Sequence, residues 1–128
     1  MQTDEKDLEL LKSAQIAIGS NYDAASFSHT VGAAVRCANG RIYTGINVYS
    51  VHSICAEHVA LGSAMTAGER DFISIVAVRG EKGEEIIPPC GNCRQILSEY
   101  APDCEVMLSE DSKVPVRELL PYAYISEM

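Results

Sequence analysis

The sequence predicts an α/β fold, a three-layer α/β/α sandwich with a mixed sheet, in one domain spanning residues 1–128. Two observations support this prediction. Segments with helical and strand periodicity follow one another in the order α, β, β, α, β, α, β, α, and helical crossovers between strands build sheets with parallel pairs. Residues 73–78, ISIVAV, form a near-continuous apolar run, which is typical of a strand buried on both faces.

The first half of the chain is expected to form a helix, a hairpin and a second helix. Residues 4–18 have apolar side chains at roughly helical spacing (Leu8, Leu11, Ala14, Ile18), and Gly19 is a typical stop, so this helix should lie on the outside of the core. Residues 30–37 and 42–48 are strand-like and flank the turn signal Ala38-Asn39-Gly40, which indicates a hairpin. A helix over residues 56–67 should end at Gly68.

The second half is expected to continue with strands separated by helices. A helix over residues 91–100 should stop before Pro102, and a strand should follow over residues 105–108. Residues 117–120 are expected to form a last short helix before Pro121. The acidic runs at 81–85 and 110–111 are interpreted as solvated loops.

Composition excludes several classes of protein. The formal charge of −8 counts against binding of nucleic acid, which requires a basic face. The sequence has no run of about 18 apolar residues, which is the length needed to span a membrane. The acidic start lacks the basic region of a secretory signal, so we expect a cytoplasmic protein. Five cysteines in a reducing compartment are first interpreted as ligands, nucleophiles or core residues.

Three of these cysteines are predicted to form a metal site. Cys90 and Cys93 lie three positions apart where a predicted helix begins after two prolines, and Cys55 lies at the start of another helix. Helix N-termini lower the pKa of a thiol, and thiolates favour zinc over magnesium or calcium. Three protein ligands leave one tetrahedral position open, which is the mark of a catalytic zinc.

Glu57, two positions after Cys55, is the candidate general base beside that open position, because a carboxylate there can take a proton from a water acidified by the metal. Alternative interpretations stay open. Zinc could be structural, with His52 or His58 as a fourth ligand, or the CxxC pair could be a redox dithiol. Glu57 alone could be an ordinary acid favoured by the helix dipole.

The segments CAE (55–57) and PCGNCRQ (89–95) resemble the zinc signature of the cytidine deaminase superfamily, in its small branch with three cysteine ligands. Within that family, residues 40–49 and 120–124 are more similar to blasticidin S deaminases. The resemblance implies a cytidine deaminase-like fold and one zinc per chain. It also implies hydrolytic deamination of a free cytosine nucleoside to the uracil form with release of ammonia. Its members are homotetramers with shared active sites, which implies that Tyr124 closes over the ligand.

The resemblance also assigns individual residues. Asn47 matches a ribose-binding position, Tyr49 stands where cytidine deaminases carry a carboxylate, and Ala56 is expected at the substrate. His58 stands where many members carry an arginine that neutralises the thiolates, which leaves that role to Arg94 and the helix N-termini. Arg94 is therefore expected to donate hydrogen bonds to sulfur.

The remaining cysteines and histidines have weaker assignments. Cys37 and Cys104 are expected to be small core residues, and His29 is a weak candidate for ligand contact.

Two substrate hypotheses remain open. One is cytidine or deoxycytidine, and the other is the antibiotic blasticidin S, whose cationic side chain an acidic protein attracts. A non-catalytic, zinc-stabilised binding module of the same fold is the alternative to an enzyme. An editor of bases in RNA or DNA is opposed by the charge and by the lack of a basic or aromatic platform.

Overall fold

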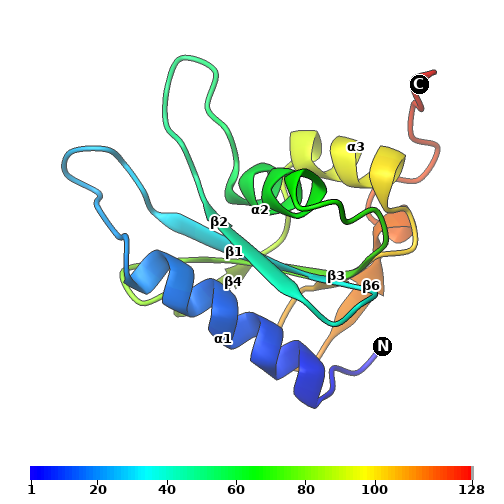
Figure 1. Ribbon diagram of the computed structural model, residues 1–128, viewed down its shortest axis with the longest axis horizontal. Helices are drawn as coiled ribbons and strands as arrows, with labels where there is room; N and C mark the ends of the chain where they lie inside the picture. Colours follow the sequence, from blue (N-terminus) through cyan, green and yellow to red (C-terminus); the bar gives the residue numbers. More distant parts are fainter. Residues whose placement is uncertain (128) are drawn as a thin grey trace.

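Helix α1 (Glu5–Gly19) covers one face of the sheet, and helices α2 (Ala56–Thr66) and α3 (Gly91–Tyr100) cover the other (Figure 1). This computed structural model describes residues 1–127, so Met128, the last residue of the predicted domain, lies outside the described residues. The strands are β1 (Val31–Cys37), β2 (Ile42–Ile46), β3 (Phe72–Arg79), β4 (Glu85–Ile87), β5 (Glu105–Met107) and β6 (Lys113–Pro115). The predicted three-layer α/β/α sandwich is confirmed.

The sheet is mixed and has the order β2-β1-β3-β5-β6. β1 pairs antiparallel with β2 and β3, β3 pairs parallel with β5, and β5 pairs antiparallel with β6. β1 occupies one edge of β3 along its whole length, so β4, which pairs with residues 77–79 of β3, shares the other edge with β5.

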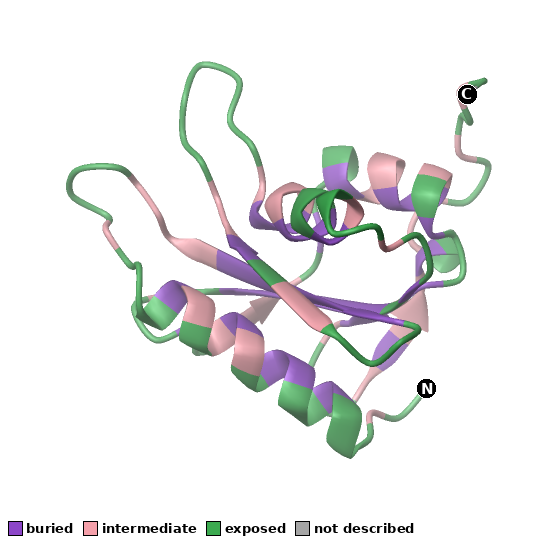
Figure 2. Ribbon diagram, viewed as in Figure 1, coloured by how far each residue is buried: buried purple, intermediate pink, exposed green. Residues whose placement is uncertain are grey.

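Side chains of the central strands alternate between the two faces of the sheet, and this alternation produces two hydrophobic cores. Ala33, Val35 and Ile75 belong to the core under α2 and α3, whereas Ala34 and Val76 belong to the core under α1. Successive side chains of a strand point to opposite faces, so strands buried on both faces must be apolar throughout. Figure 2 shows the buried residues along the middle of the sheet and on the inward sides of the helices.

The strand directions place two helix N-termini at the same edge of the sheet. β2 and β3 both run antiparallel to β1 and therefore parallel to each other. α2 follows β2, and α3 follows the short strand β4, which returns antiparallel along the last residues of β3. Helices in this position begin beyond the carboxyl ends of the strands, where ligands bind in open α/β sheets. Gly45 on β2 allows α2 to approach closely, because a Cβ at this position would lie 2.5 Å from the backbone nitrogen of Ala60.

Two loops extend past this edge of the sheet, over residues 20–30 and 47–55 (Figure 1). Each loop is closed at its base by an isolated β-bridge, one between Asp23 and His29 and the other between Val48 and Ile54. The backbone hydrogen bonds of each bridge run in both directions, at 2.8–3.0 Å. The bridges therefore hold the two sides of each loop together at its base.

A buried ion pair joins the start of α1 to the last two strands. The Nζ atom of Lys113 lies 2.8 Å from Oδ2 of Asp7 and 3.0 Å from Oε1 of Glu105. Asp7 also completes a capping box with Asp4 at the N-terminus of α1. The first residues of the chain lie along β6, where Gln2 forms a bridge with Ser112.

Several local predictions were wrong. Residues 85–87, at the end of the predicted acidic loop and just beyond it, form β4, and β6 was not predicted. The second strand of the hairpin ends at Ile46 rather than at residue 48, and the predicted last helix is a 3-10 turn over Val116–Glu118. Leu8 is half exposed, and Leu10 takes the buried position instead. No helix in the described residues is long and apolar enough to cross a membrane.

Candidate active site

The first turns of α2 and α3 bring three cysteines together. Cys55 is the N-cap residue of α2 and Cys90 is the N-cap residue of α3, and neither side chain caps its helix. N-cap positions are usually filled by side chains that bond to the helix backbone. Both sulfurs lie instead at helix N-termini, where backbone N–H groups favour negative charge.

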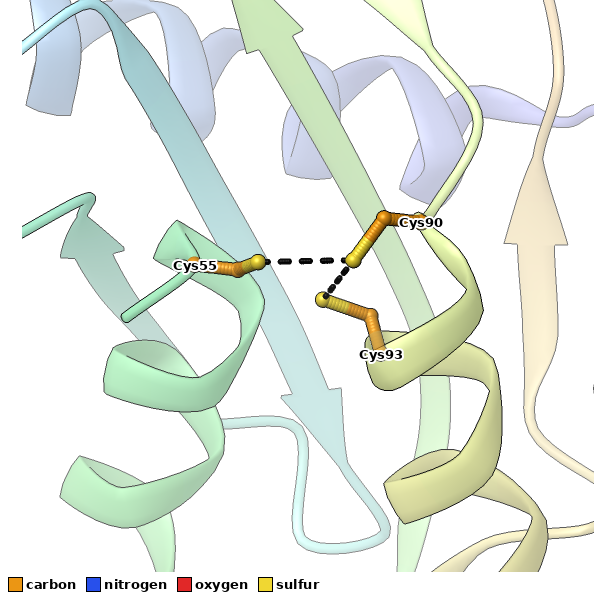
Figure 3. Close-up of side chains that lie close together, drawn as sticks. All are labelled: Cys55, Cys90 and Cys93. Carbon is orange, nitrogen blue, oxygen red and sulfur yellow. Dashed lines mark hydrogen bonds between the residues drawn. The ribbon is translucent and has the colours of Figure 1, made fainter. Parts of the chain in front are cut away.

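The sulfur atoms lie at distances that suit a tetrahedral zinc ion. Sγ of Cys90 lies 3.5 Å from Sγ of Cys55 and 3.5 Å from Sγ of Cys93, and all three atoms lie within 4.8 Å of one another (Figure 3). Zinc–sulfur bonds of about 2.3 Å at tetrahedral angles separate two sulfurs by about 3.8 Å. In the described residues, this group comprises the three cysteines and includes neither His52 nor His58. The lack of a fourth protein ligand argues against a structural zinc site, in which all four positions are filled by side chains.

Glu57 projects from the first turn of α2 next to this cluster. Its side chain is buried, with 4% of its surface exposed, and it lines the cavity beside Cys55 and Cys90. Burial raises the pKa of its carboxyl group, an effect opposed by hydrogen bonds from its own backbone N–H and from the Cys93 thiol. A carboxyl group held in this way is suited to accept and return protons near neutral pH.

Burial and local hydrogen bonds set the ionisation of the three thiols. Burial raises the pKa of Cys55 and Cys93. Burial acts the same way on Cys90, but N–H groups at the start of α3 and contacts with the other two thiols outweigh it and lower the pKa. Thiols with raised pKa values become thiolates when a divalent cation binds them, so this donor set fits zinc.

His58 contacts the cluster, and Arg94 does not. Nδ1 of His58 lies 3.7 Å from Sγ of Cys93, and burial lowers the pKa of the imidazole, which favours its neutral form. The expectation that Arg94 donates to sulfur was wrong. Its guanidinium instead donates to the carbonyl oxygens of Pro89 at 2.8 Å and Leu119 at 3.1 Å.

A cavity of about 290 Å³ opens beside the cluster. Of the predicted substrate contacts, Asn47, Tyr49 and Ala56 line it. Tyr124 does not line the cavity of its own chain. The C-terminal segment instead lies against α3, where Gln95 donates to the carbonyl oxygen of Tyr124 at 2.6 Å and Glu99 accepts from Ser126.

Five further residues line the cavity that the sequence did not indicate: Val31, Ser53, Ile54, Ile87 and Pro88. The proline pair before Cys90 was a usable signal, because it indicates a rigid approach to the cluster. Ile87 could not be found in the same way, because strand β4 was not predicted.

The other candidates lie where core or loop residues are expected. Cys37 and Cys104 are buried and free, and burial raises the pKa of Cys37 to about 11. All five cysteines are free. Nδ1 of His29 lies 2.8 Å from the carbonyl oxygen of Asn47, and the imidazole stacks on Phe27 outside the cavity lining.

Comparisons with known proteins agree with this geometry. Residues 4–109 match the model of the cytidine and deoxycytidylate deaminase zinc-binding region. The chain is 36% identical to blasticidin-S deaminase from Bacillus cereus over 94% of this chain and 93% of that protein. It is also 36% identical to cytidine deaminase from Halalkalibacterium halodurans over 76% of this chain and 78% of that protein.

Solved structures show the same fold. Cytidine deaminase from Mycobacterium tuberculosis superposes with a TM-score of 0.81 at 28% identity, covering 94% of this chain and 98% of that chain. Cytidine deaminase from Burkholderia pseudomallei gives a TM-score of 0.76 at 33% identity, covering 91% of this chain and 98% of that chain. With a three-sulfur cluster that fits zinc and a buried glutamate beside it, the chain belongs to the cytidine and deoxycytidylate deaminase family of zinc-binding enzymes.

Proposed function

We propose that this single-domain chain of residues 1–128 removes the amino group of a free cytosine nucleoside by zinc-dependent hydrolysis, with Glu57 as the catalytic residue. One zinc ion per chain would be held by Cys55, Cys90 and Cys93. The observation that supports the proposal most strongly is the position of Glu57, a buried carboxyl group that lines the cavity beside the three sulfurs.

When bound, zinc acidifies water and acts as a Lewis acid at its open position. The Glu57 carboxylate takes one proton from the attacking water and passes it to the ring nitrogen next to the amino-bearing carbon, while the water oxygen bonds to that carbon. Glu57 then moves the second proton of the water to the amino nitrogen. The carbon–nitrogen bond breaks, ammonia leaves, and the uracil form remains.

The cavity walls support a planar substrate. Val31, Ile54, Ile87 and Pro88 are apolar, and Ala56 is small enough to leave room for a ring beside Glu57. Few charged groups line this space, which suits an uncharged base. His58 supports the site by its contact with Cys93, and Arg94 by its hydrogen bond to the backbone of Pro89, the residue before Cys90.

Blasticidin S is the nucleoside that we place first among the substrates. The similarity to a protein named blasticidin-S deaminase extends over 94% of this chain, whereas the similarity to a cytidine deaminase extends over 76%. The formal charge of −8 attracts a cationic substrate and repels nucleic acid, so a free nucleoside is favoured over a base in a strand.

We further propose a homotetramer with shared active sites in the cytoplasm. Apolar side chains are exposed around the mouth of the cavity, with Val51 exposed at 93% and Tyr49 at 68%. Tyr124 is exposed at 76% on the C-terminal segment, away from its own cavity, and so is available to the cavity of a neighbouring copy. Free thiols are typical of a reducing compartment.

The test is release of ammonia from blasticidin S, cytidine, deoxycytidine and cytosine by the zinc-loaded protein, followed by ultraviolet absorbance. Glu57→Gln should keep about one zinc per chain and the folded spectrum while losing turnover by at least about 100-fold. A Glu57→Gln variant with a near-normal rate would remove Glu57 from the mechanism. If none of the four compounds releases ammonia, the non-catalytic binding module is favoured.

A further inference from the structure

Arg94 joins the segment before Cys90 to the end of the 3-10 turn over Val116–Glu118. Its Nε donates to the carbonyl oxygen of Pro89 at 2.8 Å, and its Nη1 donates to the carbonyl oxygen of Leu119 at 3.1 Å. The two acceptors belong to segments far apart in the sequence, and one guanidinium group binds both. The side chain therefore forms a bridge between these segments.

The segment before Cys90 can be held by hydrogen bonds in few ways. It consists of Pro88 and Pro89, and a proline has no backbone N–H group. Hydrogen bonds can therefore hold this segment only through its carbonyl oxygens. Strand β4 ends at Ile87, so the two prolines connect the sheet to the proposed zinc ligand Cys90. The bond from Arg94 to Pro89 acts on this connection.

The 3-10 turn at the other end of the bridge is attached to the core. Val116, its first residue, is 1% exposed, and its backbone N–H donates to the carbonyl oxygen of Cys104 at 2.9 Å. Leu119 donates its own N–H to the carbonyl oxygen of Val116 at 2.8 Å, and its side chain packs against the core under α2 and α3. The carbonyl oxygen of Leu119 is therefore a fixed point, and Arg94 ties Pro89 to it.

The charge of Arg94 does not by itself explain its place in the fold. The helix dipole disfavours a cation near a helix N-terminus, and Arg94 lies four positions after the N-cap residue Cys90. In the described residues, its side-chain hydrogen bonds go to the two carbonyls and not to sulfur. A guanidinium group offers several N–H donors in one rigid plane, which suits two acceptors at fixed positions, whereas a lysine ammonium is a point charge. The geometry therefore favours a role for the shape of this side chain.

We propose that Arg94 is a positioning residue for the zinc ligand Cys90, and that it acts through the carbonyl oxygen of Pro89. The bridge from the 3-10 turn fixes where α3 begins, and so fixes the direction from which the Cys90 sulfur approaches the other two. Cys55 lies at the start of α2, so its position does not depend on the course of the two prolines. The inference rests on the zinc ligands of the proposed function and adds a residue that holds one of them.

The first test separates the shape of the side chain from its charge. Arg94→Ala removes both, and Arg94→Lys keeps the charge but loses the planar group. In competition with a chromophoric chelator, Arg94→Ala should bind zinc about 10–100-fold more weakly than the unaltered protein, as when other groups that orient metal ligands are lost. Arg94→Lys should bind zinc no more than about threefold better than Arg94→Ala. A larger gain would show that the charge acts, and it would overturn the inference, as would unaltered affinity in Arg94→Ala.

Arg117→Ala is the matched control, because it removes the same charge from the protein and lies on the 3-10 turn itself. The Arg117 guanidinium pairs with the exposed carboxylate of Asp103. The affinity of this variant for zinc should stay within about twofold of that of the unaltered protein. A loss equal to that of Arg94→Ala would show that any arginine removed from this region has the same effect, contrary to the proposal.

The second test asks whether the effect is confined to Cys90. Arg94→Ala and Arg94→Lys are each saturated with zinc and alkylated with iodoacetamide, and the rates at Cys90 and Cys55 are followed by peptide mass spectrometry. The chelated protein supplies the intrinsic ratio of the two rates, because both thiols are then free of metal. If Cys90 alone leaves the metal, the ratio in the zinc-loaded variant should exceed the chelated ratio at least about fivefold. Equal ratios would show that the thiols are released together, and they would overturn the assignment to Cys90.

These outcomes are distinguishable from failure of the proposed function, because neither test depends on turnover. If the Arg94 variants lose zinc as expected but the unaltered protein releases ammonia from no cytosine nucleoside, the deaminase proposal fails and the role of Arg94 stands. If ammonia is released and Arg94→Lys matches the unaltered protein in zinc affinity and in labelling, the inference fails and the deaminase proposal stands.

Discussion

Nδ1 of His58 lies 3.7 Å from Sγ of Cys93, so a histidine rather than an arginine contacts the buried thiol of the cluster. Groups that donate hydrogen bonds to metal ligands raise metal affinity, and their loss costs about 10–100-fold. His58→Ala should therefore lose zinc to a chromophoric chelator about 10–100-fold more readily. His52→Ala, at an exposed loop position, should match the unaltered protein, and equal retention in both variants would exclude a role for His58.

Thiol reactivity should divide the five cysteines into two groups. In the zinc-loaded protein, iodoacetamide at pH 8 should label few thiols. After chelation, Cys90, which is exposed and has a lowered pKa, should react first. Cys37 should stay unlabelled, because it is buried and its pKa is raised to about 11, so about one thiol in 1,000 is ionised at pH 8. Labelling of Cys37 before Cys90, measured by peptide mass spectrometry, would contradict this order.

The buried ion pair at the start of α1 should be important for stability. Lys113→Met removes the cation between Asp7 and Glu105, which leaves a buried carboxylate without its partner. Breaking such a pair costs about 3 kcal/mol, so the thermal midpoint should fall by several degrees at a fixed protein concentration. Arg79→Met, which breaks the exposed Arg79–Glu85 pair, is the matched control and should leave the midpoint nearly unchanged. Similar losses in both variants would contradict the burial argument.

Glu99 should hold the C-terminal segment against α3 and so protect it from proteases. Its carboxylate accepts hydrogen bonds from Ser126 and Gln95, and these bonds lower its pKa. A lowered pKa means that the stabilisation is present above the ordinary glutamate range and is lost as the pH falls through the lowered value. Glu99→Ala should speed chymotrypsin cleavage after Tyr122 and Tyr124 at neutral pH, whereas Glu118→Ala should not. Unchanged cleavage would mean that Glu99 does not hold the segment.

The proposed homotetramer should depend on the exposed apolar side chains of the loop over residues 47–55. Val51→Asp places a charge on the most exposed of its apolar side chains and should shift the protein from tetramer toward smaller species in light scattering. Ile16→Asp, on the exposed side of α1, makes the same chemical change elsewhere. A Val51→Asp protein that remains tetrameric would place the interface on another surface.

The metal site could be predicted from sequence because local rules determine it. Cys55 and Cys90 lie at the starts of two helices, Cys93 lies three positions after Cys90, and α3 begins and ends at the predicted residues. The strands β4 and β6 could not be predicted in this way. Each has three residues and little periodicity, and each is held by pairing with the preceding strand across a turn.

The roles of polar side chains were harder to predict than their positions. Arg94 was correctly placed on α3, but its partners are the carbonyls of Pro89 and of Leu119, which lies 25 positions away. Asn47 was correctly assigned to the cavity, yet the backbone groups that occupy its amide belong to the preceding loop. Such contacts depend on the three-dimensional course of the chain, which periodicity and motif spacing do not contain.

The β-bridges at the bases of the two loops have a consequence for how such an enzyme can diversify. The bridges of Asp23 with His29 and of Val48 with Ile54 isolate the tips of these loops from the sheet. The residues of the chemistry lie instead on the first turns of two helices. Mutations that accumulate at the loop tips can therefore change which compounds are accepted while the reaction itself is inherited intact. A laboratory selection for new substrates should find its first useful variants within residues 24–28 and 49–53.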